Sequence, residues 1–499
     1  MMNILSRQGK QGRTPYPVKV VQFGDGNFMR AFADWQIHIM NTELDWNAGV
    51  AVLQNRAGGR SAEQLHEQNG LFTVCVEGYR DGQTVREYTL VESVVQGMNP
   101  YKNYEAYAEL AVQPELRFVL SNTTEAGIVY AEEDRLEDQP QSTFPGKLTA
   151  LLYRRYQVFN GDPAKGLIII PCELIERNGE TLRDIVLRHA AKWELEEPFS
   201  RWLREHNLFC SSLVDRIVSG YPQERAAEME AELGYQDPFL TVAEPYHLWV
   251  IEGPDWLRAE FPAHQAGLNV IITDDLSSYR IRKVRILNGA HTALTPVAYL
   301  NDLNTVEEAV NHELSGAFVE ALIREEIIPA LDIRAQELHQ YADSVLERFR
   351  NPYLRHQLLS IALNSWSKFD ARLKPSLLSF VQQQERLPDR MVFSLASLIV
   401  MYKGSRGSER INLSDDPAIL ELFQQEWEQY DGTREAADRL VSRILADARV
   451  CGGELGTVAG LSERVADHVH EIAELGMSQA LAHFLDTSDR LIAAQEGED

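Results

Sequence analysis

A short apolar strand, a glycine turn and a helical pattern open this chain, and their order constrains the fold more than any other feature. Residues 18–23 read Val-Lys-Val-Val-Gln-Phe, and Gly24-Asp-Gly26 follows at once. Apolar residues at helical spacing then run through Ile37 to a second apolar strand at 50–53. Strand, tight turn, helix and strand in this order open a dinucleotide-binding α/β fold. We therefore expect a Rossmann-like domain at the N-terminus.

The glycine turn has the chemistry that a phosphate needs. Gly24 permits the tight turn, and Gly26 lets backbone N–H groups approach a pyrophosphate at the start of the helix. The third glycine of the usual G-x-G-x-x-G pattern is replaced by Met29. An ordinary strand–helix turn that needs glycine for its backbone angles therefore remains an alternative. Arg30 pairs with a phosphate in one interpretation and is simply solvated in the other.

Further apolar runs predict a mostly parallel sheet with helices on both faces. These strands are predicted at 72–76, 87–90, 117–120 and 167–170. Polar segments follow two of them, at Ser121–Gly127 and at Pro171–Gly179. Ligands bind at the carboxyl ends of strands in such sheets, although a well-bonded turn explains each segment equally well.

The second half of the chain, from about Leu276, is dominated by long helical patterns. We predict helices at 283–300, 305–327, 344–349, 354–369, 389–402, 418–428, 433–448 and 465–485. The length of 499 residues exceeds what one core usually supports. The sequence thus predicts a dinucleotide-binding domain over 15–270 and a helical substrate-binding domain over 271–490.

Charge and cysteine content restrict the class of partner. Lys and Arg number 48 against 74 Asp and Glu, which gives 48 − 74 = −26. This balance argues against nucleic acid or an anionic membrane as the main partner, while a locally basic pocket still accepts an anionic small molecule. The four cysteines form no metal-binding pattern, so we expect no metal and a reducing, cytoplasmic location. The sequence does not define the oligomeric state.

The stretch from Arg282 to His291 places a lysine beside an asparagine and a histidine. On an α-helical wheel with Lys283 at zero, Asn288 falls near 140° and His291 near 80°, at about 100° per residue. The apolar residues of the stretch fall close to Lys283, so we expect its ammonium to face the core, where burial lowers the pKa. Such a lysine serves as a general base or acid. The alternative is a lysine at the core edge that extends to water.

Two other polar groups are candidates for substrate contacts. Leu213–Ile217 places Asp215 and Arg216 between apolar residues, as a structural ion pair or as a charge pair in the substrate site. A largely basic stretch lies in the helical half, at Arg350, Asn351, His356, Lys368 and Arg372. Its cations bind a substrate carboxylate in one interpretation, or form a solvated helix face in the other.

Four segments together resemble the polyol-specific long-chain dehydrogenase/reductase family, which includes mannitol dehydrogenases. They are Phe23–Arg30, Leu213–Ile217, the spacing Lys283-x4-Asn288-x2-His291 and Arg348–Pro352. The resemblance covers roughly 17–485. It implies that Lys283, Asn288 and His291 are catalytic. It also implies an NAD cofactor, bound at Phe23, Gly24, Gly26, Asn27, Phe28, Arg30, Asn122, Thr124 and Glu125. The residues alone leave NAD or NADP open, because Gln54-Asn-Arg56 lacks the acidic residue that often binds the ribose hydroxyls.

One departure from the family affects the substrate site. Mannitol dehydrogenases carry Cys-Asp-Asn where this chain has Cys172-Glu-Leu174. Either Asn178 replaces that asparagine, or Asn288 acts without a second amide. The predicted substrate contacts are Asn178, Asp215, Arg216, Lys368 and Arg372.

Within the family, the chain most resembles reductases of sugar acids. Segments such as Ser121–Ile128, Leu287–Leu294 and His356–Asn364 carry this likeness. We expect a sugar-acid substrate and an NAD-dependent oxidoreductase acting on CH–OH groups. The alternatives are a related sugar acid, an uncharged polyol, or a catalytically silent dinucleotide-binding sensor.

Overall fold

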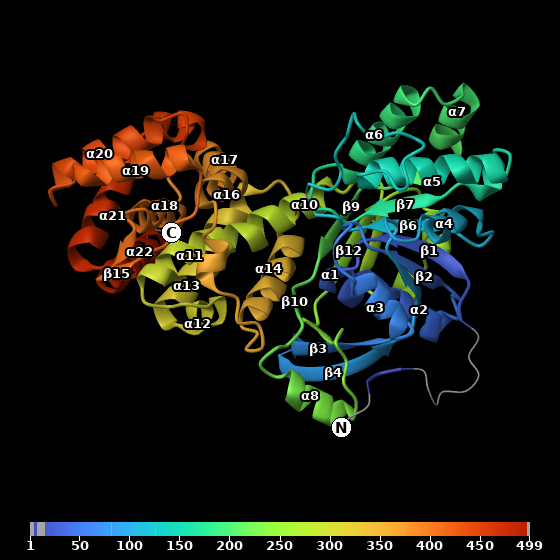
Figure 1. Ribbon diagram of the computed structural model, residues 1–499. Helices are drawn as coiled ribbons and strands as arrows, with labels where there is room; N and C mark the ends of the chain where they lie inside the picture. The colour runs from blue at the N-terminus through green and yellow to red at the C-terminus, as the bar shows by residue number, and fades with distance from the viewer. Residues whose placement is uncertain (1–3, 7–14, 81, 125, 497–499) are drawn as a thin grey trace. The chain divides into compact units, whose positions relative to one another are not determined.

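The computed structural model describes residues 4–6, 15–80, 82–124 and 126–496, with side chains as far as residue 487. The chain forms two compact units, Met1–Ser277 and Ser278–Asp499. The first contains the principal sheets, and the second is almost entirely helical (Figure 1). The predicted fold class, a Rossmann-like domain followed by a helical one, is confirmed.

A six-stranded parallel sheet forms the centre of the first unit. In spatial order its strands are β5 (Val94–Met98), β2 (Gly49–Leu53), β1 (Val18–Phe23), β6 (Phe118–Ser121), β7 (Ile168–Pro171) and β8 (Leu208–Phe209). The order reverses direction between β1 and β6, which is the point where ligands bind in open parallel sheets. The glycine turn and the segment after β6 both start there.

Alternate residues of β1 face opposite layers of helices. Val20 packs with Phe32 and Ile37, which come from the helix after the glycine turn. Val21 and Phe23 pack on the other face with helices farther along the chain. Figure 1 shows α2 and α3 on one side of the sheet and α5 and α6 on the other. Both faces of the strands are thus buried, which explains their continuous apolar sequences.

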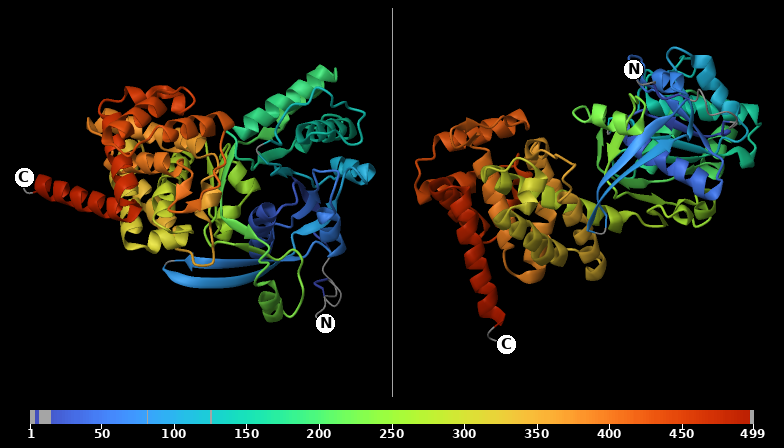
Figure 2. Two further views of the ribbon diagram at one scale, coloured as in Figure 1. Left: turned by 60° about the vertical axis from the view of Figure 1, so that its left-hand side comes forward. Right: turned by 90° about the horizontal axis from the view of Figure 1, so that it is seen from below.

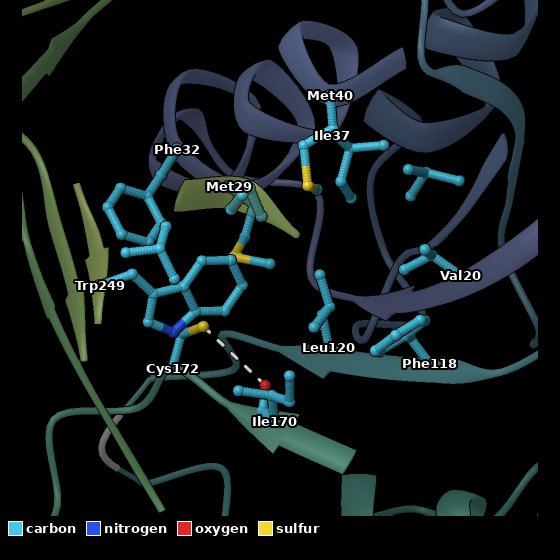
Figure 3. Packing of buried hydrophobic residues seen from close by; sticks show 14 of the residues in the cluster. Val20, Met29, Phe32, Ile37, Met40, Phe118, Leu120, Ile170, Cys172 and Trp249 are labelled. Carbon is cyan, nitrogen blue, oxygen red and sulfur yellow. Dashed lines mark hydrogen bonds between the residues drawn. The ribbon is translucent and has the colours of Figure 1, made fainter. Parts of the chain in front are cut away.

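The helices of this unit are short except for α2, α5, α6 and α7. In chain order they are α1 (Asn27–Met29), the π turn η1 (Arg30–Asp34), α2 (Trp35–Leu44), α3 (Ser61–Glu67), α4 (Tyr104–Ala108), η2 (Glu109–Val112), α5 (Phe144–Val158), η3 (Pro163–Lys165), α6 (Asn178–Lys192), α7 (Glu197–His206), α8 (Ala226–Leu233), α9 (Leu257–Glu260) and η4 (Ala263–Ala266). Figure 3 shows Phe32 beside Trp249, whose ring centroids are 5.3 Å apart. The aromatic core thereby fixes the helix that follows the glycine turn.

Two of the predicted strands belong to a different sheet. The runs at 72–76 and 87–90 extend to β3 (Phe72–Arg80) and β4 (Gln83–Val91), which pair antiparallel as a long hairpin (Figure 2). Their sheet is completed by β11 (Thr241–Ala243) and β10 (Val218–Gly220). A third sheet contains β9 (Ser212–Asp215), β12 (Leu248–Glu252) and β13 (Val270–Thr273). Apolar runs predicted β3 and β4 but not their pairing, because pairing is decided by distant residues, and β9 to β13 were not predicted.

The helical unit is built around two buried helices, α11 (Gly289–Leu300) and α18 (Asp389–Met401), which pack together. The others are α10 (Ser277–Arg282), the π turn η5 (Lys283–Asn288), α12 (Val306–Asn311), α13 (Glu313–Ala321), the π turn η6 (Leu322–Ile327), η7 (Ile328–Ala330), α14 (Ala335–Phe349), α15 (Leu358–Ile361), α16 (Ser365–Arg372), α17 (Lys374–Gln384), α19 (Pro417–Glu428), α20 (Arg434–Ala446), η8 (Cys451–Thr457), α21 (Leu461–Leu475) and α22 (Met477–Glu496). A short hairpin, β14 (Ser405–Arg406) and β15 (Glu409–Arg410), interrupts them.

Several predicted helices are broken in the structure. The run 465–485 is split by Gly476, which has a φ of +80°. The run 305–327 is split at His312, whose side chain caps α13. The run 354–369 is divided between α15 and α16, and α17 was not predicted. Apolar periodicity continues across such breaks, so it does not reveal them.

Candidate functional site

The glycine turn is held against the segment that follows β6. Gly24 has a φ of +120°, and a Cβ there would lie 2.6 Å from the backbone oxygen of Asn122. The amide of Asn122 in turn donates to the carbonyl oxygen of Phe23 at 2.9 Å. Gly24 is therefore required both by its backbone angle and by this close approach.

Gly26 faces open space at the start of the helix. It precedes α1 with extended backbone angles, and a Cβ there would meet no atom within 4 Å. The helix continues through η1 into α2, so its unpaired N–H groups and dipole are available to an anion. This open space beside a helix start fits the phosphates of a dinucleotide.

The side chains around this turn are used by the protein itself. Arg30 is buried and donates to the carbonyl oxygen of Asp25 at 2.7 Å, to Thr241 and to the side chain of Asn27. Burial lowers the pKa of Arg30. Phe28 stacks on Phe32. Because these side chains are bonded or packed within the protein, the groups of the turn that remain for a cofactor are backbone atoms.

A buried carboxylate that sequence reasoning missed shapes the neighbouring segment. Glu173 accepts hydrogen bonds from Ser121 Oγ and from the amide and hydroxyl of Thr123, at 2.8–2.9 Å. Burial raises its pKa. Thr124 adopts a φ of +76°, and Glu125 lies outside the described residues. An acidic residue directly after a buried strand was the available signal.

Asn178 has no hydrogen-bonding capacity left for a substrate. It is fully buried, and its amide nitrogen donates to the carbonyl oxygens of Pro171, Glu173 and Ser212 at 3.0–3.1 Å. Its side-chain oxygen accepts from two backbone amides. This geometry argues against the prediction that Asn178 polarises a substrate oxygen. Leu174, which stands where the family has asparagine, is 57% exposed.

Arg216 is likewise engaged within its unit. It donates to the carbonyl oxygens of Glu244 at 2.9 Å and Ala31 at 2.6 Å, and it lies over the ring of Trp35. Burial lowers its pKa to about 10. Asp215, its neighbour in the sequence, is buried at the end of β9. Arg216 thus connects the glycine-turn helix to the β9–β10 segment.

In the helical unit, a π turn brings the predicted catalytic residues onto one side. The amide of Gly289 bonds to the carbonyl oxygen of Val284, five residues back. In a regular α-helix, Asn288 would lie about 140° around from Lys283. An i→i+5 turn instead places residues five apart nearly one above the other. Lys283 and Asn288 are both half-buried rather than enclosed, which corrects the expectation that the lysine faces the core.

His291 lies in an aromatic cluster on the next turn. Its ring stacks on Phe349 with centroids 4.2 Å apart, and the ring of His356 meets it edge-on at 5.2 Å. His356 is half-buried, and its pKa is lowered by burial and by the nearby charge of Lys368. Phe349 carried no functional signal in the sequence, whereas His356 was predicted as part of the basic stretch that contains Lys368 and Arg372.

Three cations beside this cluster donate hydrogen bonds to neutral oxygens. Arg372 donates to Thr292 Oγ1 at 3.2 Å, Lys368 to the carbonyl oxygen of Ile361 at 2.7 Å, and Arg285 to backbone carbonyls. Burial lowers the pKa of all three side chains. Within the described ranges, none of them forms an ion pair. An incoming anion would bind favourably to the positive charge that these side chains bring together.

Across the described part of the chain, no cluster of histidine, cysteine and acidic side chains is suited to hold a metal ion. The same residues include no helix with the length and apolar character needed to cross a membrane. The four cysteines are buried and unpaired.

Comparisons with known proteins identify the family of this chain. Family models for the mannitol dehydrogenase Rossmann domain and C-terminal domain match residues 18–264 and 275–473. An altronate oxidoreductase of Bacillus subtilis is 51% identical, with 94% of this chain and 96% of that protein covered. One from Yersinia enterocolitica is 45% identical, with 97% and 100% covered.

A solved structure shares the fold. Mannitol 2-dehydrogenase of Pseudomonas fluorescens, in a ternary complex with NAD and D-mannitol, superposes with a TM-score of 0.70 at 23% identity and covers 94% of each chain. Together with the family models, which match most of the chain, this confirms the family predicted from the sequence. The chain belongs to the mannitol dehydrogenase family.

Proposed function

We propose that this protein is an NAD-dependent oxidoreductase that reduces the keto group of D-tagaturonate to give D-altronate, reversibly, in cytoplasmic hexuronate catabolism. The substrate follows from relatives named altronate oxidoreductase, which are 45–51% identical over nearly their full length. The observation that supports a charged substrate is the pair of cations Lys368 and Arg372, neither of which forms an ion pair among the described residues.

The cofactor is assigned to the N-terminal unit. Reduced nicotinamide supplies a hydride when the cofactor is bound. The open space over Gly26 receives the pyrophosphate, and the close contact of Gly24 with Asn122 keeps the turn in shape. NAD is the proposed form, because the relatives' fold includes an NAD complex.

Proton transfer is assigned to side chains of the helical unit. Lys283 donates it to the ketone oxygen during reduction and accepts it during oxidation. Asn288 donates a hydrogen bond to the same oxygen, where negative charge develops. His291 orients a substrate hydroxyl or the lysine, and Lys368 or Arg372 binds the substrate carboxylate.

A panel of ketoses tests this proposal. NADH oxidation is measured with tagaturonate, with fructuronate and with uncharged fructose. We expect tagaturonate to give the highest kcat/KM. Lys368→Met or Arg372→Met should raise KM for tagaturonate about 10- to 100-fold, the range for a charge-assisted hydrogen bond of 1.5–3 kcal/mol, and leave that for fructose nearly unchanged. A higher kcat/KM with fructuronate or fructose would show that the protein is a reductase of the same family with a different substrate. NADH binding without turnover of any ketose would favour a sensor.

A further inference from the structure

Arg285 is a partly buried cation inside the π turn η5 that the proposed mechanism does not use. Its guanidinium donates to the carbonyl oxygens of Ala371 at 3.1 Å and Arg372 at 3.3 Å. These carbonyls belong to the last turn of α16. The last four carbonyls of a helix have no intrahelical partner and carry partial negative charge, so a cation stabilises them.

The hydrogen bonds of Arg285 are part of a closed circuit through three elements. Arg285 in η5 binds the backbone of Arg372, whose side chain donates to Thr292 Oγ1 on α11 at 3.2 Å. Thr292 Oγ1 donates in turn to the carbonyl oxygen of Asn288, at 2.9 Å, which returns the circuit to η5. The turn that carries Lys283 and Asn288 is thereby connected to Arg372 by hydrogen bonds of 2.9–3.3 Å.

We propose that Arg285 is a positioning residue that holds the turn carrying Lys283 and Asn288 in register with Lys368 and Arg372 on α16. This inference rests on the proposed function and deepens it. Arg285 itself does not touch the substrate. Through η5, Arg285 positions the residues that act on the keto group of the substrate. Through the backbone of Arg372, it positions a side chain proposed to bind the substrate carboxylate.

The test is Arg285→Met, which keeps most of the side-chain volume and removes the donors. We expect kcat to fall about 10-fold with every ketose that the wild-type enzyme reduces, because Lys283 and Asn288 lose their register. KM should rise about 10-fold for tagaturonate only, because Arg372 also loses its support. Arg285→Lys retains one donor group and should recover part of both losses.

Arg406→Met is the matched control in the same unit. Arg406 donates to the carbonyl oxygen of Tyr299, in the last turn of α11, at 3.2 Å. Both variants remove a guanidinium from a helix C-terminus, so both should lower the melting temperature. Only Arg285→Met should change kcat and KM. Equal kinetic losses in the two variants at a temperature where both are folded would reduce Arg285 to a helix cap and overturn the inference.

A double mutant gives an independent test. Arg285→Met combined with Arg372→Met should raise KM for tagaturonate hardly more than Arg372→Met alone, since both act through one residue. Fully additive effects would contradict the circuit. If wild-type protein reduces fructose but not tagaturonate, the proposed substrate fails, and the Arg285 inference is still decided by kcat for fructose.

Discussion

The glycine turn of the N-terminal unit and the π turn η5 of the helical unit expose different parts of the chain. Around the glycine turn, Asn27, Arg30 and Arg216 bond to the protein, and backbone is left open over Gly26. Around η5, side chains are partly exposed, and cations such as Arg372 lack acidic partners among the described residues. Backbone groups suit a phosphate of fixed shape, whereas side chains suit a reacting group that needs a proton and charge compensation.

Lys283→Ala should produce the largest effect and the clearest separation of the two regions. Removing a general acid–base group costs about 10²- to 10⁴-fold in turnover. We expect kcat for tagaturonate to fall by about 1000-fold while the dissociation constant for NADH, measured by fluorescence titration, stays unchanged. Turnover near the wild-type value would remove the lysine from the mechanism.

Gly26→Val should give the opposite pattern. The backbone at Gly26 is extended and a Cβ there meets no protein atom within 4 Å, so we expect valine to leave the melting temperature near the wild-type value. Its methyl groups would fill the space assigned to the pyrophosphate, and NADH affinity should fall at least 100-fold, or about 2.7 kcal/mol. Unchanged affinity by calorimetry would rule out this turn as the phosphate site. Gly24→Val should instead destabilise the fold, because of its φ of +120° and the nearby Asn122 oxygen.

Two asparagines sharpen the comparison further. Asn288→Ala should lower kcat about 100-fold, as expected for loss of a hydrogen bond to a developing oxyanion, with little change in stability.

Asn178→Ala should lower the free energy of unfolding by about 2 kcal/mol or more, because it leaves several buried backbone groups unpaired. Purified Asn178→Ala that is folded should keep a near wild-type kcat. A loss of kcat without destabilisation would restore Asn178 to the active site.

The last prediction concerns stability rather than activity, and it involves Asp34, a fully buried residue of the glycine-turn helix. Burial raises the pKa of its carboxyl from 3.8 to about 7. Between about pH 4 and pH 7 the folded state therefore keeps a proton that the unfolded state loses. Stability should fall as pH rises through this window, by at most about 1.4 kcal/mol per pH unit for this group. Asp34→Asn should flatten that dependence in urea unfolding at pH 5, 6 and 7. An unchanged slope would show that Asp34 is ionised in the fold.

The first strands, the glycine turn and the helical second half were predictable because they depend on local patterns. The run 18–23 is β1 with the predicted bounds, and α11 lies within the helix predicted at 283–300. The hairpin of β3 and β4 was assigned to the wrong sheet, because its partner β11 lies about 165 residues away. Neither could the roles of Asn178 and Arg216 be predicted, since their hydrogen-bond partners come from several separate segments.

The residues Lys283, Asn288 and His291 do not fall on one face of a regular α-helix. The prediction that Lys283 faces the core was wrong because it assumed α-helical geometry through the π turn. A π turn amounts to one extra residue within a helical turn. Everything before it, including α10, is rotated by about 100° relative to α11. Shortening the chain by one residue between Val284 and Leu287 would therefore rotate the amine of Lys283 about the helix axis, while α11 kept its position in the core. The five-residue interval between Lys283 and Asn288 therefore determines the angle between the two side chains around the helix axis as well as their separation along it.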